Sequence, residues 1–198
     1  MLTKKEADDI MKMKGEVRGV VFQTDATYLK IKYGEEGLKK VEENLKQLGY
    51  PIEFEKVKAM GWYPMGLRGL SLMVIKDTFN WDDAAVKAMG NMAPKFSFMV
   101  KILMRYFISL EQTVKSAPLY WPKHYSAGEL VIADYSEEKK YVNIRLEGIK
   151  FLPVFCKYIE GYFSRIIQFA LPDKEVSSQQ IKCSYRGDPY DEYKVSWI

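Results

Sequence analysis

The sequence predicts an α+β fold, in which an N-terminal helical layer packs on a C-terminal antiparallel sheet that carries one long helix. In segment 152–170, apolar residues recur at i, i+3 and i+4 without a break. Hairpin patterns flank that segment at 129–146 and 175–197. The 198 residues are 47% hydrophobic and supply one sizeable core. We therefore expect a single domain over 1–198, comprising a mainly helical layer (1–120) and a strand–strand–helix–strand–strand unit (121–198).

The helical layer begins with a short predicted helix. Thr3 and Glu6 have the spacing of a capping box, so we expect a helix from there to about Lys14, closed by Gly15. The β-branched run 16–22 comes next. That composition is typical of a strand or of an apolar lead-in to the following helix.

Two further helices are predicted before residue 50. Thr24 or Asp25 has the N-cap position of the first, which runs to Gly34. The second spans 35–48 and ends at Gly49. Its apolar residues repeat at helical spacing, namely Leu38, Val41, Leu45 and Leu48.

Residues 57–107 are rich in methionine and aromatic side chains. The segment Trp62-Tyr63-Pro64 is typical of a turn or a helix entry, since proline is tolerated in a first turn. We expect Asn80 to be the N-cap of a helix over 81–89, and Pro94 to break the segment that follows this helix. Ser97 then has the starting position of a very apolar helix that runs to Leu110.

Two interpretations of this methionine and aromatic concentration stay open. Methionine fills irregular gaps in ordinary cores, and the composition alone favours that interpretation. Ligand pockets, however, are also lined mainly by apolar and aromatic side chains. If the segment lines a cavity, the candidate ligand-binding residues are Trp62, Tyr63, Met73, Phe96, Met99, Leu103, Phe107 and Trp121.

The C-terminal unit is predicted in more detail. Strand 129–135 pairs with 141–146, Pro153 begins the long helix, and 175–186 pairs with 190–197. An exposed final strand near Trp197 would invite edge-to-edge pairing with a second copy. A homodimer is therefore one expectation, and a separate signalling partner is another.

Charge and motifs exclude several classes of function. The 30 basic and 26 acidic residues are interleaved and give a net charge of +4, so we expect no nucleic-acid partner. No apolar run is long enough to span a membrane, and the charged N-terminus is unlike a signal peptide, which favours a cytoplasmic protein with reduced thiols. The chain has no P-loop, Rossmann glycine pattern, His-Glu-x-x-His or nucleophile elbow. We therefore expect no enzyme. A Cys156/His124 dyad is the remaining alternative, although an apolar helix face makes a thiol inert.

Motifs in the last third carry a family resemblance. Cys156 is followed by Gly161-Tyr162, Gln180 precedes Cys183 by three residues, and Gly187 opens a turn that leads to Asp191. This pattern resembles the 4-vinyl-reductase (4VR) domain family, within the wider haem NO-binding-like ligand-sensing superfamily. The N-terminal stretches 19–22 and 33–38, together with 62–64, resemble related bacterial proteins of unassigned function, so the likeness covers most of the chain.

The resemblance implies a small-molecule sensor or carrier. Members of the family hold an apolar ligand, such as an aromatic effector or an acyl chain, between the helical layer and a curved sheet. Relatives in vesicle-tethering complexes act mainly as assembly surfaces. The alternative function is therefore a protein–protein assembly module whose cavity is collapsed or constitutively filled.

The resemblance also raises the question of zinc. In several aromatic-sensing members, four motif positions bind a structural zinc, and here those positions hold Cys156, Gln180, Cys183 and Asp191. Zinc prefers thiolate, imidazole and carboxylate ligands, so the neutral amide of Gln180 is a poor one. We expect a degenerate site, with Cys156, Cys183 and Asp191 as the candidate metal ligands.

Haem is the second cofactor that the superfamily suggests. Its haem-binding branch uses a histidine and a Tyr-x-Ser-x-Arg motif. The only histidine here, His124, lies in the proline-rich segment 118–126, which we expect to be a linker. The segment 162–165 (Tyr-Phe-Ser-Arg) is one residue short of the motif. We therefore expect no haem and no other cofactor, with zinc as the one alternative.

Overall fold

The computed structural model describes residues 2–98, 100 and 109–198. The described helices are α1 (Lys4–Met11), α2 (Val20–Gln47), α3 (Met65–Thr78), α4 (Asp83–Phe96), α6 (Leu110–His124) and α7 (Pro153–Ala170). The strands are β1 (Glu16–Arg18), β2 (Trp62–Pro64), β3 (Glu129–Ser136), β4 (Tyr141–Glu147), β5 (Val176–Lys182) and β6 (Asp191–Trp197). Two short 3₁₀ turns are η1 (Phe54–Lys56) and η2 (Ser184–Arg186).

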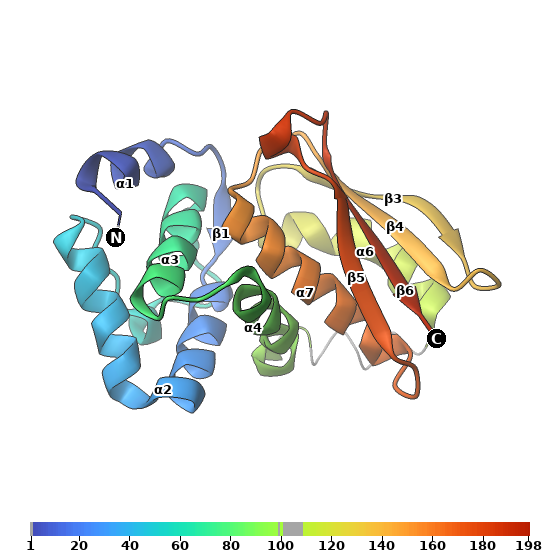
Figure 1. Ribbon diagram of the computed structural model, residues 1–198, viewed down its shortest axis with the longest axis horizontal. Helices are drawn as coiled ribbons and strands as arrows, with labels where there is room; N and C mark the ends of the chain where they lie inside the picture. The colour runs from blue at the N-terminus through green and yellow to red at the C-terminus, as the bar shows by residue number, and fades with distance from the viewer. Residues whose placement is uncertain (1, 99, 101–108) are drawn as a thin grey trace.

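The molecule has a helical end and a sheet end (Figure 1). Helices α1, α2 and α3 form the helical end, and α7 runs across one face of the sheet at the other. Helix α4 lies between the two and packs most extensively on α7. The expected α+β architecture is confirmed. None of the helices in the described part of the chain is long and apolar enough to cross a membrane.

The four-stranded sheet is antiparallel and has the order β3-β4-β6-β5. Both predicted hairpins are therefore confirmed. The prediction that the final strand is an exposed edge is wrong, because β6 pairs with β4 on one side and β5 on the other. Trp197 is buried at the end of this central strand. Pairing through β6 thus gives no basis for a dimer.

Helix α2 begins earlier than predicted. Neither Thr24 nor Asp25 is an N-cap, because both lie inside a helix that starts at Val20. A loop from elsewhere in the chain satisfies the first N–H groups instead, since Gly19 N donates to Gly61 O and Val20 N to Ala59 O (both 2.9 Å). Such a tertiary cap has no local sequence signal.

The boundary between α3 and α4 also differs from the prediction. Asn80 has a positive φ of 49° and lies past the end of α3, a conformation that asparagine tolerates better than most residues. The N-cap of α4 is Asp82, whose side chain accepts from Ala85 N. Pro94 lies inside α4 and does not stop it before Phe96. The helix is therefore shifted toward the C-terminus relative to the predicted 81–89.

The short ribbon β1–β2 connects the helical end to α6. Trp62–Pro64 pairs antiparallel with Glu16–Arg18, and Pro64 is also the N-cap of α3, so the predicted helix entry is confirmed. Ser126 N donates to Glu16 O (2.9 Å) on the other side of the ribbon. The predicted helix from Ser97 falls mostly on positions 99 and 101–108, outside the described residues. At its start, Val100 N donates to Ser97 Oγ (3.3 Å).

The predicted linker 118–126 is wrong, because most of it belongs to helix α6. Pro118 and Pro122 both lie inside this helix. They are four residues apart and therefore share one side of it, where each removes only one backbone hydrogen bond. The same helix buries Leu110, Thr113, Val114 and Trp121. This burial compensates for the hydrogen bonds that the prolines lose.

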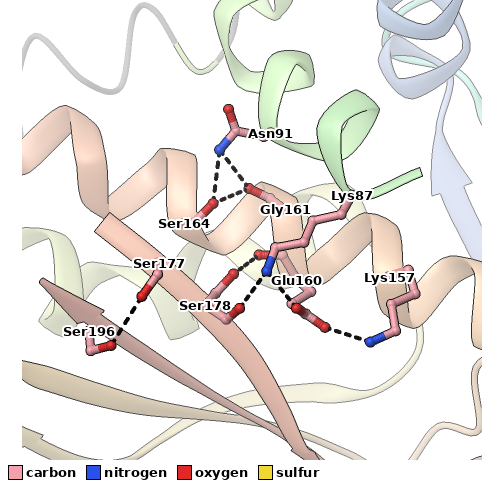
Figure 2. A network of polar contacts seen from close by, with 9 residues as sticks. All are labelled: Lys87, Asn91, Lys157, Glu160, Gly161, Ser164, Ser177, Ser178 and Ser196. Carbon is pink, nitrogen blue, oxygen red and sulfur yellow. Dashed lines mark hydrogen bonds and ion pairs between the residues drawn. The ribbon is translucent and has the colours of Figure 1, made fainter. Parts of the chain in front are cut away.

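Polar contacts fasten α4 to α7 and to the sheet (Figure 2). Lys87 Nζ donates to Glu160 Oε1 (2.6 Å) and to the carbonyl of Ser178 on β5 (2.5 Å). Asn91 Nδ2 donates to Ser164 Oγ (2.9 Å). One face of α7 thus contacts α4, and another face lines the site described below.

Candidate ligand-binding site

An apolar cavity lies between α6, α7 and the β3–β4 hairpin. The described residues that line it come from all of these elements. They are Val100, Thr113, Val114, Ala117, Tyr120, Trp121, His124, Tyr125, Leu130, Ile132, Ile144, Ile159, Tyr162, Phe163, Ile166 and Ile167.

The cavity is large enough for a small organic molecule. Its volume is about 100 Å³. For comparison, an apolar cavity of about 150 Å³ in another protein stays dry and binds benzene. The wall here is almost wholly apolar, so it favours a ligand of similar character over water.

A smaller, more polar hollow adjoins the cavity. It is lined by the side chains His124, Tyr125 and Tyr162, which also line the cavity, and by Val20, Val21, Thr24, Ala93, Ser97 and Tyr158. Its space of about 30 Å³ suffices for a water molecule or for one polar group of a ligand. The three shared residues therefore lie where the apolar and polar spaces meet.

The polar groups around this junction are uncharged near neutral pH. Burial, with the positive charges of Arg18 and Lys123, lowers the pKa of His124 to about 4. Burial raises the pKa of Tyr125 to about 12 and also raises the pKa of Tyr162. The junction thus offers a neutral imidazole and neutral phenols, which donate and accept hydrogen bonds without attracting ions.

A buried ion pair lies beside the tyrosines. Arg68 on α3 and Asp25 on α2 are both fully buried, and Arg68 Nη1 donates to Asp25 Oδ2. The Arg68 guanidinium also lies 4.5 Å from the ring centroid of Tyr158. Because the two charges compensate each other, the pair adds no net charge to the site.

Of the residues predicted to bind a ligand, Trp121 lines the cavity, where it stacks on Tyr125 (4.2 Å between centroids). The other described ones lie elsewhere. Trp62 is 36% exposed and stacks under the Arg18 guanidinium (3.8 Å), while Tyr63 packs on Phe22. Met73 packs at the edge of the core on α3, and Phe96 ends α4. Met99, Leu103 and Phe107 lie outside the described residues.

Most of the cavity wall was missed in the sequence, although part of it had a signal. The apolar stripe of α7 supplies Ile159, Phe163 and Ile166, and the alternation of β4 supplies Ile144. Both patterns predict burial, but neither distinguishes a cavity wall from a filled core. His124 was misplaced because its segment was expected to be a linker, whereas it lies in the last turn of α6.

The four positions of the resembled zinc site come together in space. The ligand atoms of Cys156, Cys183 and Asp191 all lie within 4.8 Å of one another, and all three residues are buried. Gln180 joins them through a hydrogen bond from Nε2 to Asp191 Oδ1 (2.9 Å). Burial, followed by the nearby Asp191, raises the pKa of the Cys156 thiol to about 12, so the thiol is protonated at neutral pH. The four motif positions therefore lie together, on the side of α7 that faces the last hairpin.

The described part of the cavity wall does not fit a haem. His124 has the neutral imidazole that iron binds, but no arginine or lysine among the described lining residues faces the cavity to pair with porphyrin carboxylates. In the segment 162–165, Tyr162 lines the cavity while Arg165 Nε donates to Asn91 O (3.1 Å) on α4. A porphyrin is also several times larger than the benzene-sized space. The expectation of no haem stays a prediction.

The sequence matches no family model and no curated protein. The structure, however, is similar to solved H-NOX proteins. An H-NOX protein from S. oneidensis in the Fe(II)NO ligation state is 12% identical with a TM-score of 0.68, over 91% of this chain and 99% of that one. The Fe(II) unliganded H-NOX protein from K. algicida is 11% identical with a TM-score of 0.62, over 91% and 96%.

A further similar structure is an oxygen-binding H-NOX domain related to soluble guanylate cyclases, in its oxygen complex. It is 12% identical with a TM-score of 0.63, over 91% of this chain and 94% of that one. At such low identity, these similarities establish the fold alone. The 4VR membership stays a prediction, and the expected haem NO-binding-like fold is confirmed.

Proposed function

We propose that the chain is a binding domain, a sensor or carrier, that holds a small apolar or aromatic molecule without haem. The observation that carries the proposal is the apolar cavity between α6, α7 and the β3–β4 hairpin. A wall of this composition favours an uncharged ligand because a buried, unpaired charge is costly. An acyl chain that enters the same space is the second form of ligand that we propose.

The polar junction supports a role in orientation. Ligand pockets typically combine an apolar wall with a few placed polar groups that fix the ligand's direction. His124, Tyr125 and Tyr162 occupy that position here. We propose binding rather than catalysis, because the two residues of the Cys156/His124 dyad lie in different sites. His124 faces the cavity, whereas Cys156 contacts Asp191.

Methyl NMR with benzene as the probe tests the proposal. We expect benzene to shift the methyl signals of Ile144, Ile159 and Ile166, and native mass spectrometry of the purified protein to detect any molecule already bound. The variant Ala117→Phe fills the cavity from α6 and is expected to abolish the shifts. Leu119→Phe, on the exposed side of the same helix, is the matched control.

Two results would contradict the proposal. The first is that benzene leaves the methyl signals of all three isoleucines unshifted in a protein that carries no co-purified molecule. The second is that Ala117→Phe retains the shifts that Leu119→Phe shows. A co-purified molecule that does not exchange would instead favour the assembly module with a constitutively filled cavity.

A further inference from the structure

Hydrogen bonds at the junction of α7 and the last hairpin converge on one carboxylate. Asp191 is fully buried at the start of β6. Its Oδ1 accepts from Gln180 Nε2 (2.9 Å) and Ser184 N (3.0 Å), and its Oδ2 accepts from Ser184 Oγ (2.8 Å). The Cys156 thiol lies 3.7 Å from Oδ1 and donates to it. Four donors from α7, β5 and the turn after β5 thus surround a single anion.

This arrangement has the opposite polarity to a zinc centre. In a zinc site, the lone pairs of thiolates, imidazoles or carboxylates point inward at a cation. Here, N–H, O–H and S–H groups point inward at an anion. A carboxylate only accepts, so the Gln180 amide must present its N–H groups to Asp191, and those groups repel a metal ion. Such donors are what a buried carboxylate requires.

We infer that Gln180 and Asp191 are a matched pair that turns the zinc position of the resembled family into a metal-free, hydrogen-bonded junction. Each departure from the zinc pattern explains the other. An anion at 191 needs a donor at 180, and glutamine supplies one. A glutamate there would place two carboxylates within hydrogen-bond distance of each other.

The two cysteines have unequal roles in this junction. Cys156 contributes its thiol to the Asp191 carboxylate. Cys183 contributes its backbone, because its N–H donates to Asp188 Oδ2 (2.7 Å) in the turn that precedes β6. A structural metal would depend on both sulfurs equally. The hydrogen-bonded junction depends on Asp191 far more than on the Cys183 sulfur.

Metal binding by the wild-type protein is the first test. We expect Co²⁺ to produce no thiolate-to-cobalt absorption, the purified protein to contain no stoichiometric zinc, and EDTA to leave Tm unchanged. One equivalent of zinc with a lower Tm in EDTA would overturn the inference, because a structural metal contributes folding energy.

Variants provide the second test. Asp191→Asn and Gln180→Glu are each expected to lower Tm by more than Cys183→Ala, in the absence of metal. An equal or larger loss for Cys183→Ala would overturn the inference. The double variant Gln180→Glu/Asp191→Cys restores the zinc pattern, so we expect cobalt–thiolate absorption and a zinc-dependent rise in Tm. A soluble, folded double variant without either signal would count against the matched pair.

Discussion

Arg68 and Asp25 form a fully buried ion pair with incomplete hydrogen bonding. Among the described residues, Arg68 Nε and Nη2 and Asp25 Oδ1 have no hydrogen-bond partner. Burial raises the pKa of Asp25 to about 6, with Arg68 opposing that rise. A pair of this kind gives little net stability over apolar residues of similar size, but the loss of one member leaves an uncompensated buried charge.

Replacing one or both members of the pair separates these effects. Arg68→Met alone is expected to lower the free energy of unfolding by about 3–5 kcal/mol. The double variant Asp25→Leu/Arg68→Met is expected to recover most of that loss, as measured by urea denaturation. Lys30→Met is the control, because it removes a cation from the partly exposed Lys30–Glu55 pair and should cost less than about 1 kcal/mol. A double variant as unstable as the single one would contradict this.

His124 predicts a second, pH-dependent effect. Its pKa is about 4 in the folded protein and about 6.5 when exposed, so the unfolded chain binds more protons between these values. The free energy of unfolding therefore does not depend on His124 titration above pH 6.5. It decreases as the pH falls toward 4, by at most about 3 kcal/mol. Asp25 has the opposite slope in an overlapping range, so the wild-type profile alone does not isolate His124.

The comparison of wild type with His124→Gln isolates the histidine. The variant is expected to gain stability relative to wild type when the pH falls from 7.5 to 5, as followed by urea denaturation at each pH. The slope from Asp25 is common to both proteins and cancels in the difference. A difference that stays constant over this range would show that the histidine titrates normally.

At the scale of elements, the crossing of α4 and α7 depends on two glycines. A Cβ on Gly161 would lie 1.9 Å from Lys87 O, and one on Gly90 would lie 1.9 Å from Tyr158 O. The backbones therefore approach more closely than any side chain allows. This approach brings Lys87 within reach of Glu160 and β5 (Figure 2).

Gly161→Ala tests the crossing. The added methyl group meets backbone rather than a flexible side chain, so we expect a loss of about 1–3 kcal/mol despite the better helix propensity of alanine. Gly69→Ala is the matched control. It also adds a methyl group to a helix, but it meets the side-chain ends of Leu152 and Met13 at 3.0 and 3.3 Å. Thermal unfolding should show Gly69→Ala close to wild type, and an equal loss in both would refute the backbone contact.

The elements predicted correctly are those whose burial is encoded locally. Helix α7 follows a helical period, strand β4 alternates between buried and half-buried residues, and α1 has its capping box. Helix α6 was missed because two prolines hid an amphipathic helix, and the start of α2 because its cap is a distant loop. Tertiary contacts decide both cases.

At the scale of the whole molecule, the cavity lies between α6, α7 and the β3–β4 hairpin, and the smaller polar hollow beside it is lined also by α2 and α4. Tyr158 and Tyr162 on α7, Thr24 on α2 and Ser97 after α4 all line the small hollow. The family resemblance implied an apolar site between helices and sheet. The sequence did not reveal the correct wall, because the composition of the wall resembles an ordinary core and only the packing leaves a space.

Ligand binding to the folded state alone should raise Tm. At a benzene concentration of 100 times Kd, linkage contributes about 2.7 kcal/mol. For a chain of this size, that corresponds to a rise in Tm of roughly 5–10 °C. Differential scanning calorimetry checks this. Ala117→Phe should lose the concentration dependence and Leu119→Phe should keep it, whereas an equal rise in all three proteins would indicate binding elsewhere.

Because β6 lies between β4 and β5, the four-stranded sheet is complete only when this last strand of the chain has paired. β3 and β4 form a local hairpin, but β5 reaches that hairpin only through β6. Before β6 pairs, one edge of β4 is unpaired and the β3–β4 hairpin is not hydrogen-bonded to β5. The pairs of β4 with β6 join residues about 45 or more positions apart, so loop closure precedes their formation and slows it. We therefore expect insertion of β6 to be the late, slow step of folding, and a chain interrupted before Asp191 to present two open strand edges prone to aggregation.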